Sequence, residues 1–171
     1  SNTMDEKAMF RLSYGLFVVT AREGDKDNGC ITNTVQQVTV TPNRITVAVN
    51  KANYTCGMIE RTRKFNVSIL SEKSSFDIFK HWGFQSGANV DKAVGITFSR
   101  AENGVIYVTE GVNAVLCANV SQIIDLGTHL LFIADVEDAF VLSDTPSATY
   151  AFYHQHIKPA PQAQKKKGWV C

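Results

Sequence analysis

The sequence predicts a mainly β protein, an antiparallel barrel with a few short helices. Along most of the chain, apolar and polar residues alternate with the two-residue period of half-buried strands. Turn signals rich in Gly, Pro, Asn and Asp separate these stretches, and two segments have the composition and cap signals of short helices. Many antiparallel strands with few helices favour closure of the sheet on itself, because closure removes exposed edges.

In the first half of the chain, strands are expected to alternate with two helices. An Asn28-Gly29 pair is typical of a chain reversal, and the turn Thr41-Pro42-Asn43-Arg44 has proline and asparagine at favoured positions. Asn53 or Thr55 would cap the first helix, and Gly83 would end the second. The expected strands are 14–21, 30–40, 44–50 and 65–70, and the expected helices are 55–63 and 74–83.

The second half is again rich in strands and then changes character. Strands 96–98 and 105–108 flank an Asn103-Gly104 hairpin signal, and two long strands follow at 114–124 and 129–141. After His156 the composition shifts to Pro, Ala and Gln and then to lysines, as in a linker. We therefore expect one domain over 4–157, and we interpret residues 1–3 as the remnant of an expression tag.

Composition limits the classes of function. The 171 residues allow one domain with a substantial core, and a net charge of +1 gives no basic footprint for nucleic acid. No apolar run approaches the length of a membrane-spanning helix, so no membrane partner is expected. His154 and His156 lack a nearby carboxylate or thiol in the sequence, so we expect no metal site. The cysteines are widely spaced, which favours free thiols in a reducing, cytoplasmic setting; they are Cys30, Cys56, Cys117 and Cys171.

Polar side chains gather at the ends of two expected strands, where a core strand would carry aliphatic residues. The first group is the segment 32–37, Thr-Asn-Thr-Val-Gln-Gln. Burying such groups is costly unless they are hydrogen-bonded, so their density suggests a polar ligand. The amides of Asn33, Gln36 and Gln37 suit a flat heteroaromatic ring with imide and carbonyl groups. An ordinary polar outer face of the sheet is the alternative.

The second group is the segment 50–55, Asn-Lys-Ala-Asn-Tyr-Thr, at an expected strand-to-helix junction. A phosphate ester is bound by hydroxyls, backbone N–H groups and a cation, preferably beside a helix N-terminus. Lys51 would supply the charge, and Thr55 would supply a hydroxyl with exposed amides behind it. The alternative is an ordinary capped helix with a solvated lysine.

In their order and spacing these segments resemble the flavin reductase-like, FMN-binding split-barrel family. The resemblance spans nearly all of residues 8–155, and within the family the chain looks most like flavoredoxin and the flavin domain of high-molecular-weight rubredoxin. It implies a split β-barrel, a homodimer and FMN bound near the subunit interface. The segments that carry it are 28–55, FNVSILSE (65–72), GFQSG (83–87), Asp91-Lys92 and the run 125–129, Asp-Leu-Gly-Thr-His.

By position, the resemblance implies a set of residues that hold FMN. Those along the flavin and near its ring would be Thr32, Asn33, Thr34, Val35 and Gln36, and those at the ribityl phosphate would be Asn50, Lys51, Tyr54, Thr55 and Ser86. His129 would be catalytic, because an imidazole beside the flavin and the nicotinamide stabilises reduced flavin or orients the hydride donor. A turn histidine bonded to backbone is the alternative. Relatives often carry an arginine near Ala88, so one cationic contact is missing here.

The end of the chain, Gly168-Trp169-Val170-Cys171, resembles the aromatic-x-Cys start of a rubredoxin iron knuckle. Residues 158–171 are therefore expected to be a linker and the truncated start of a rubredoxin domain, with chance as the alternative.

The resemblance implies that NAD(P)H, as a transient substrate, reduces bound FMN. Electrons would then pass to a rubredoxin domain or protein and onward to a flavodiiron-type partner. The alternatives are a flavin reductase that supplies reduced FMN to a monooxygenase and a non-catalytic flavin electron carrier.

Overall fold

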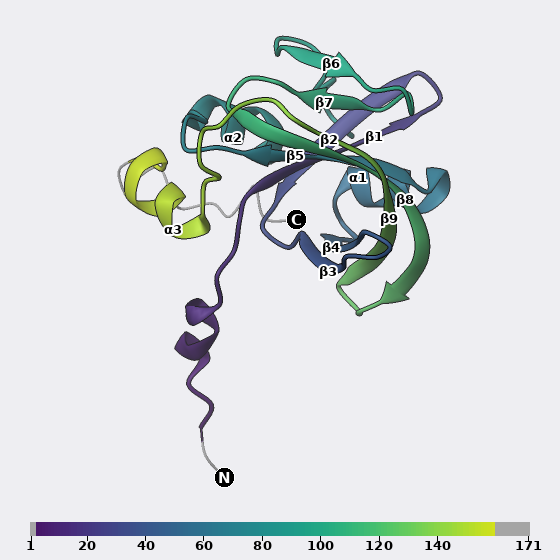
Figure 1. Ribbon diagram of the computed structural model, residues 1–171. Coiled ribbons are helices and arrows are strands. Elements are labelled where there is room, and N and C mark those ends of the chain that lie inside the picture. Colours follow the sequence, from purple (N-terminus) through teal and green to yellow (C-terminus); the bar gives the residue numbers. More distant parts are fainter. Residues whose placement is uncertain (1–2, 160–171) are drawn as a thin grey trace.

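Within residues 3–159, which the computed structural model describes, seven strands form one antiparallel sheet that curls into a split barrel (Figure 1). The order across the sheet is β2-β1-β5-β8-β9-β4-β3, while β6 pairs separately with β7. The strands are β1 Phe17–Glu23, β2 Lys26–Thr32, β3 Gln36–Thr39, β4 Arg44–Asn50, β5 Lys64–Leu70, β6 Phe98–Arg100, β7 Ile106–Val108, β8 Val112–Asp125 and β9 His129–Val141.

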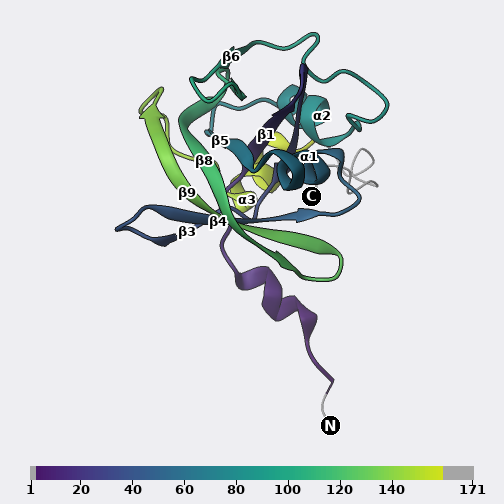
Figure 2. The same cartoon turned by 90° about the vertical axis from the view of Figure 1, so that its right-hand side faces the viewer.

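Short helices flank the sheet, as expected. A 3-10 helix near the N-terminus extends away from the barrel, which is clearest after the quarter turn of Figure 2. No described helix is long and apolar enough to cross a membrane. The helices are η1 Glu6–Arg11, α1 Tyr54–Thr62, α2 Phe76–Gly83, α3 Tyr150–Phe152 and the π-helical turn η2 Tyr153–Ile157.

The long strands β8 and β9 join the two halves of the barrel. β8 pairs with β5 on one side, and β9 pairs with β4 on the other. The pairing of β8 with β9 shifts between Cys117 and Ala118 and again between Val120 and Gln122. Such bulges bend a strand and increase its twist. The pair therefore curves from one half of the sheet to the other, as its bent ribbons in Figure 1 show.

The barrel is open between β2 and β3, which are the two edges of the sheet. The single strand expected over 30–40 is broken at 33–35. The cause is Thr34, whose hydroxyl donates to the Ala48 carbonyl at 2.8 Å and lies 3.3 Å from the Ala48 amide. These bonds draw the chain across to β4. The sheet therefore does not close completely, which differs from what the number of strands predicts. The split barrel that the family resemblance implies is confirmed.

The first hairpin turns at Gly24, and the expected reversal at Asn28-Gly29 is wrong. Gly24 has φ +60°, a left-handed conformation that glycine adopts without strain. Gly29 lies inside β2, where a Cβ would come within 2.9 Å of the Trp82 and Thr20 side chains. Its missing side chain therefore allows α2 to pack closely on β2. The reversal expected at Asn103-Gly104 is confirmed between β6 and β7.

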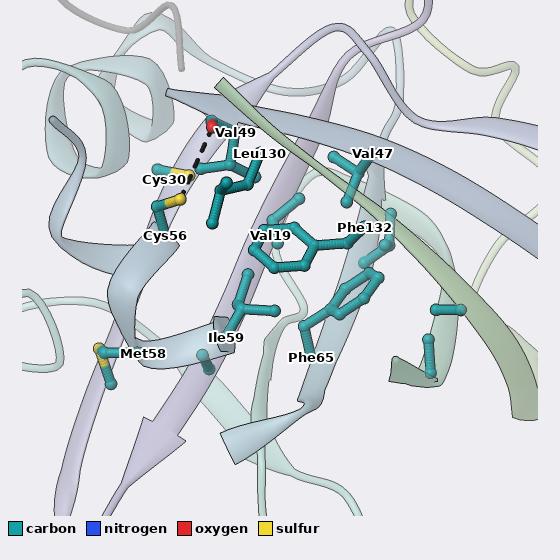
Figure 3. Packing of buried hydrophobic residues seen from close by; sticks show 14 of the residues in the cluster. Val19, Cys30, Val47, Val49, Cys56, Met58, Ile59, Phe65, Leu130 and Phe132 are labelled. Carbon is teal, nitrogen blue, oxygen red and sulfur yellow. Dashed lines mark hydrogen bonds between the residues drawn. The ribbon is translucent and has the colours of Figure 1, made fainter. Parts of the chain in front are cut away.

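Both faces of β1 are buried, so successive residues of this strand enter different cores. Val19 packs inside the barrel with Val47, Phe65 and Phe132, on the side covered by α1 (Figure 3). Val18 packs on the opposite face of the sheet, against α2 and the β6–β7 hairpin. The strand therefore carries a continuous apolar run in place of strict alternation.

Cys56 and Cys117 are buried thiols, one in each core. The Cys56 thiol lies 3.6 Å from the Val49 carbonyl and can donate to it (Figure 3). Burial raises the pKa of each thiol to about 11, so both stay protonated at neutral pH. A nucleophile acts as the thiolate, and these two cysteines therefore have structural roles. Cys171 lies outside the described residues.

The raised thiol pKa values predict a loss of stability in mild alkali. A thiol that holds its proton more tightly when folded contributes stability below its unfolded pKa of 9.0, and this stability is lost as the pH rises towards about 11. We expect urea titrations to show the free energy of unfolding falling by about 1 kcal/mol per thiol between about pH 8 and pH 10. The double variant Cys56→Ala, Cys117→Ala should have a lower free energy of unfolding than the parent protein at every pH, but that free energy should fall less steeply as the pH rises. An equally steep fall in that variant would contradict the assignment.

Candidate functional site

A pocket of about 250 Å³ lies between the start of α1 and the segment that follows α2. Residues 52–54 line one side and residues 83–87 line the other, together with Lys92. Tyr54 and Ser86, both expected to contact the cofactor, meet here although they are far apart in the sequence. The walls carry amide, hydroxyl and ammonium groups, which suit a polar, anionic ligand.

Two asparagine side chains shape the wall at α1. Asn50 ends β4, and its Oδ1 accepts a hydrogen bond from the Ala52 amide at 2.9 Å. Asn53 is the N-cap, and its Oδ1 accepts from the Thr55 amide at 2.9 Å. Asparagine is favoured at an N-cap because it satisfies an amide that has no partner within the helix. The turn between β4 and α1 is thus fixed by local hydrogen bonds.

Thr55 lies behind this wall. Its side chain is fully buried, and its hydroxyl accepts a hydrogen bond from Asn28 Nδ2 at 3.0 Å. Asn28, on β2, is itself 1% exposed, and Gly87 packs directly against it: a Cβ on Gly87 would lie 2.3 Å from Asn28 Oδ1. The Thr55 hydroxyl, expected at the phosphate, here joins α1 to β2.

Two lysines that the sequence reasoning did not assign to the site border the pocket. Lys92 is 2% exposed, and its Nζ donates to the carbonyls of Gly29 at 2.8 Å and Trp82 at 2.7 Å. Lys26, half-buried on β2, donates to the Gly87 carbonyl at 2.8 Å. Lys92 belongs to a segment that carried the family resemblance, so it could have been found. Lys26 follows a turn and has the sequence context of a solvated lysine, so nothing in the sequence marks it.

A second polar cluster lies where β4 ends beside the β8–β9 turn. Lys51 Nζ contacts Asp125 Oδ1 at 2.7 Å, and this ammonium holds the pKa of the Asp125 carboxyl below its usual value. His129 begins β9 directly opposite Asn50 of β4. Directly opposed residues have Cβ atoms about 5 Å apart. The structure therefore brings together three of the expected site residues, which are Asn50, Lys51 and His129.

The third group is the crossing segment between β2 and β3. The hydroxyls of Thr32 and Thr34 lie 2.6 Å apart, and Thr34 is also tied to β4. Asn33 is half-buried, Val35 packs against the barrel core, and Gln36 is exposed at the start of β3. Two amide side chains are thus partly accessible beside β4.

Comparison with known proteins places this chain in one family. Residues 9–161 match the family described as flavin reductase like domain. The chain therefore belongs to this family, and it is a flavin reductase-type oxidoreductase.

Individual relatives agree with the family. The chain is 41% identical over 152 residues to high molecular weight rubredoxin of Moorella thermoacetica, covering 89% of this chain and 66% of that protein. It is 36% identical over 151 residues to ferric-chelate reductase (NAD(P)H) of Archaeoglobus fulgidus, covering 88% of this chain and 89% of that protein. An FMN-binding protein from Thermus thermophilus has the same fold, with a TM-score of 0.72 at 21% identity over 82% of this chain and 78% of that one. The chain thus spans about two thirds of the rubredoxin relative.

The chemistry of the site fits a phosphorylated flavin. The pocket offers the Ser86 hydroxyl, the start of α1 and nearby ammonium groups, which together suit a phosphate. Its volume of about 250 Å³ is below the range of about 300–1,000 Å³ typical for a whole cofactor or drug-sized ligand, so the flavin ring would lie outside it. The partly accessible amides of Asn33 and Gln36 suit the polar edge of such a ring. Among residues 3–159, no cluster of three His, Cys, Asp or Glu residues is placed to hold a metal ion.

The buried contact between α1 and β2 predicts a specific effect on stability. In Thr55→Val the Asn28 amide loses its acceptor while the side-chain volume is kept. We expect urea titration to show a loss of about 1–3 kcal/mol in the free energy of unfolding, the cost of an unsatisfied buried donor. As a control, Thr46→Val on β4, a half-buried position, should change stability by less than about 0.5 kcal/mol. A Thr55→Val protein as stable as the parent would contradict the structural role.

Proposed function

We propose that the chain is an FMN-dependent NAD(P)H oxidoreductase that passes electrons to a rubredoxin-type acceptor. The supporting observation is the pocket at the start of α1, where a hydroxyl, amides and ammonium groups converge. The N-terminus of a helix carries partial positive charge, so the start of α1 favours a phosphate. FMN carries a phosphate and riboflavin does not, which makes FMN the cofactor that this pocket suits.

In this proposal two regions of the chain bind FMN, one at its phosphate and one along its ring. The pocket and the adjoining 50–55 segment hold the ribityl phosphate through Asn50, Lys51, Tyr54, Thr55 and Ser86, with Thr55 acting from behind the wall. The crossing segment lies along the ring through Thr32, Asn33, Thr34, Val35 and Gln36. Hydride and one-electron chemistry is what bound FMN supplies. The chain's own residues position the two reactants and keep water away from them.

His129 is the proposed catalytic residue. It begins β9 opposite Asn50, at the end of β4 that adjoins the 50–55 segment. Its Nδ1 lies 2.8 Å from the Thr128 hydroxyl, a contact that orients the ring. An imidazole at this place stabilises negative charge that develops on the flavin or orients the nicotinamide.

The proposed acceptor is a rubredoxin domain or protein, with a flavodiiron-type protein further along the route. The Moorella relative supports the first step, because it is named a rubredoxin and extends beyond the region matched here. We further propose a homodimer. Its support is the N-terminal arm, residues 4–12, in which Met4, Met9, Phe10 and Leu12 are exposed. A reducing, cytoplasmic location suits the buried, protonated thiols of Cys56 and Cys117.

Anaerobic mixing of the FMN-loaded protein with NADH or NADPH tests the hydride step. We expect the flavin absorbance band to bleach with at least one nucleotide. His129→Gln should slow bleaching about ten-fold or more, because it removes the imidazole from the reaction, while the Kd for FMN changes less than about two-fold. His156→Gln, at an exposed position of η2, should leave both quantities unchanged.

The other outcomes of this experiment identify the alternatives. No bleaching with either nucleotide, with reduction by a redox protein instead, would show a non-catalytic electron carrier. Bleaching followed by rapid release of the reduced flavin would show a reductase that supplies a monooxygenase. A His129→Gln protein that reacts as fast as the parent would remove that residue from the mechanism.

A further inference from the structure

The segment that follows α2 forms a turn with its own internal bonds. The amides of Asn89 and Val90 donate to the Ser86 carbonyl at 3.0 and 3.1 Å, and the Ala88 amide donates to the Ser86 hydroxyl at 3.1 Å. These bonds hold the turn together but do not attach it to the barrel. The start of the turn is attached to α2, because Gln85 Nε2 donates to the His81 carbonyl at 2.9 Å and the Phe84 ring packs on Phe76. Beyond Gln85, its position over the pocket depends on its contacts with β2.

At its far end the turn is anchored by Lys92. The ammonium is buried and donates to Trp82 at the end of α2 and to Gly29 on β2. β2 is an edge strand, so an outward carbonyl such as that of Gly29 has no neighbouring strand to pair with. An ammonium with two carbonyl acceptors in a buried place is costly to displace. Lys92 therefore keeps this end of the turn attached to α2 and β2 when the rest of the turn moves.

Nearer the pocket the turn is held by Lys26. Its Nζ donates to the Gly87 carbonyl at 2.8 Å and lies 4.8 Å from the centre of the Tyr54 ring. Gly87 and Tyr54 line opposite walls of the pocket. One ammonium thus bridges both walls. Lys26 is only half-buried, so water can replace its contacts when the turn moves away.

We propose that Lys26 is a latch, a positioning residue that holds residues 84–91 closed against α1 and sets how fast a ligand leaves the pocket. The proposal rests on the proposed function in one respect, that the ligand is FMN. The turn pivots about the Lys92 anchor, and opening it breaks the Lys26–Gly87 bond and lifts the ammonium from Tyr54. Because the bond involves a charged donor, its loss should speed release about ten-fold.

The test compares Lys26→Met with Lys26→Arg, using Lys64→Met at an exposed position of β5 as the control. In flavin-free protein, amide hydrogen exchange over residues 84–91 should quicken about ten-fold in Lys26→Met. It should stay near the parent value in Lys26→Arg, which keeps a charged donor, and in Lys64→Met. Unchanged exchange in Lys26→Met would overturn the latch whether or not FMN binds.

The second measurement follows release of FMN and of riboflavin from the loaded proteins by rapid dilution. A latch predicts that Lys26→Met releases both flavins about ten-fold faster, with rescue by Lys26→Arg. Faster release of FMN with unchanged release of riboflavin would show that Lys26 acts only through its charge on the phosphate and does not hold the turn. Unchanged release of both flavins would show that the turn does not limit exit, and either result overturns the latch. If the parent protein retains no flavin, the proposed function fails, and the exchange measurement still decides whether Lys26 closes the turn.

Discussion

The arrangement of the site depends on one buried amide, that of Asn28. It lies on β2, donates to the Thr55 hydroxyl of α1 and packs against the backbone of Gly87. A single side chain therefore fixes the distance from the sheet to both walls of the pocket. Its Oδ1 is buried and has no hydrogen-bond partner among the described residues. A glycine at 87 is part of the same constraint, because any side chain there would collide with Asn28.

The segment that packs against the edge strand β2 also forms part of the candidate site. β2 has β1 on one side. α2 packs on its face, and the segment that follows α2 reaches its other side, where Lys92 donates to the Gly29 carbonyl. Covering an edge strand prevents unwanted pairing with other chains. Here the covering segment also forms a wall of the pocket, and Lys26 and Lys92 attach it. The split in the barrel has a comparable effect, since the break between β2 and β3 leaves Asn33 and Gln36 accessible beside β4.

The sequence predicts those elements whose formation depends on residues close together in the chain. Strand alternation and helix caps act over a few residues, so β4, β5 and β9 and the two longer helices were predicted close to their observed bounds. The break before β3 was missed because its cause is a bond from Thr34 to Ala48, a neighbour only in the folded chain. The sequence predicts a turn at Gly29 that the structure does not have, because the packing of this glycine against Trp82 is equally non-local. Most residues of the candidate site followed from the family resemblance, whereas Lys26 acts on a carbonyl 61 positions away and left no sequence signal.

The central claim is that the pocket at the start of α1 recognises the phosphate of a flavin. Calorimetric titration of the flavin-free protein with FMN and with riboflavin tests it most directly, because the two ligands differ in that phosphate. The account predicts that FMN binds at least about 100-fold more tightly, with the difference shrinking as salt is raised. Equal affinities for FMN and riboflavin would contradict it.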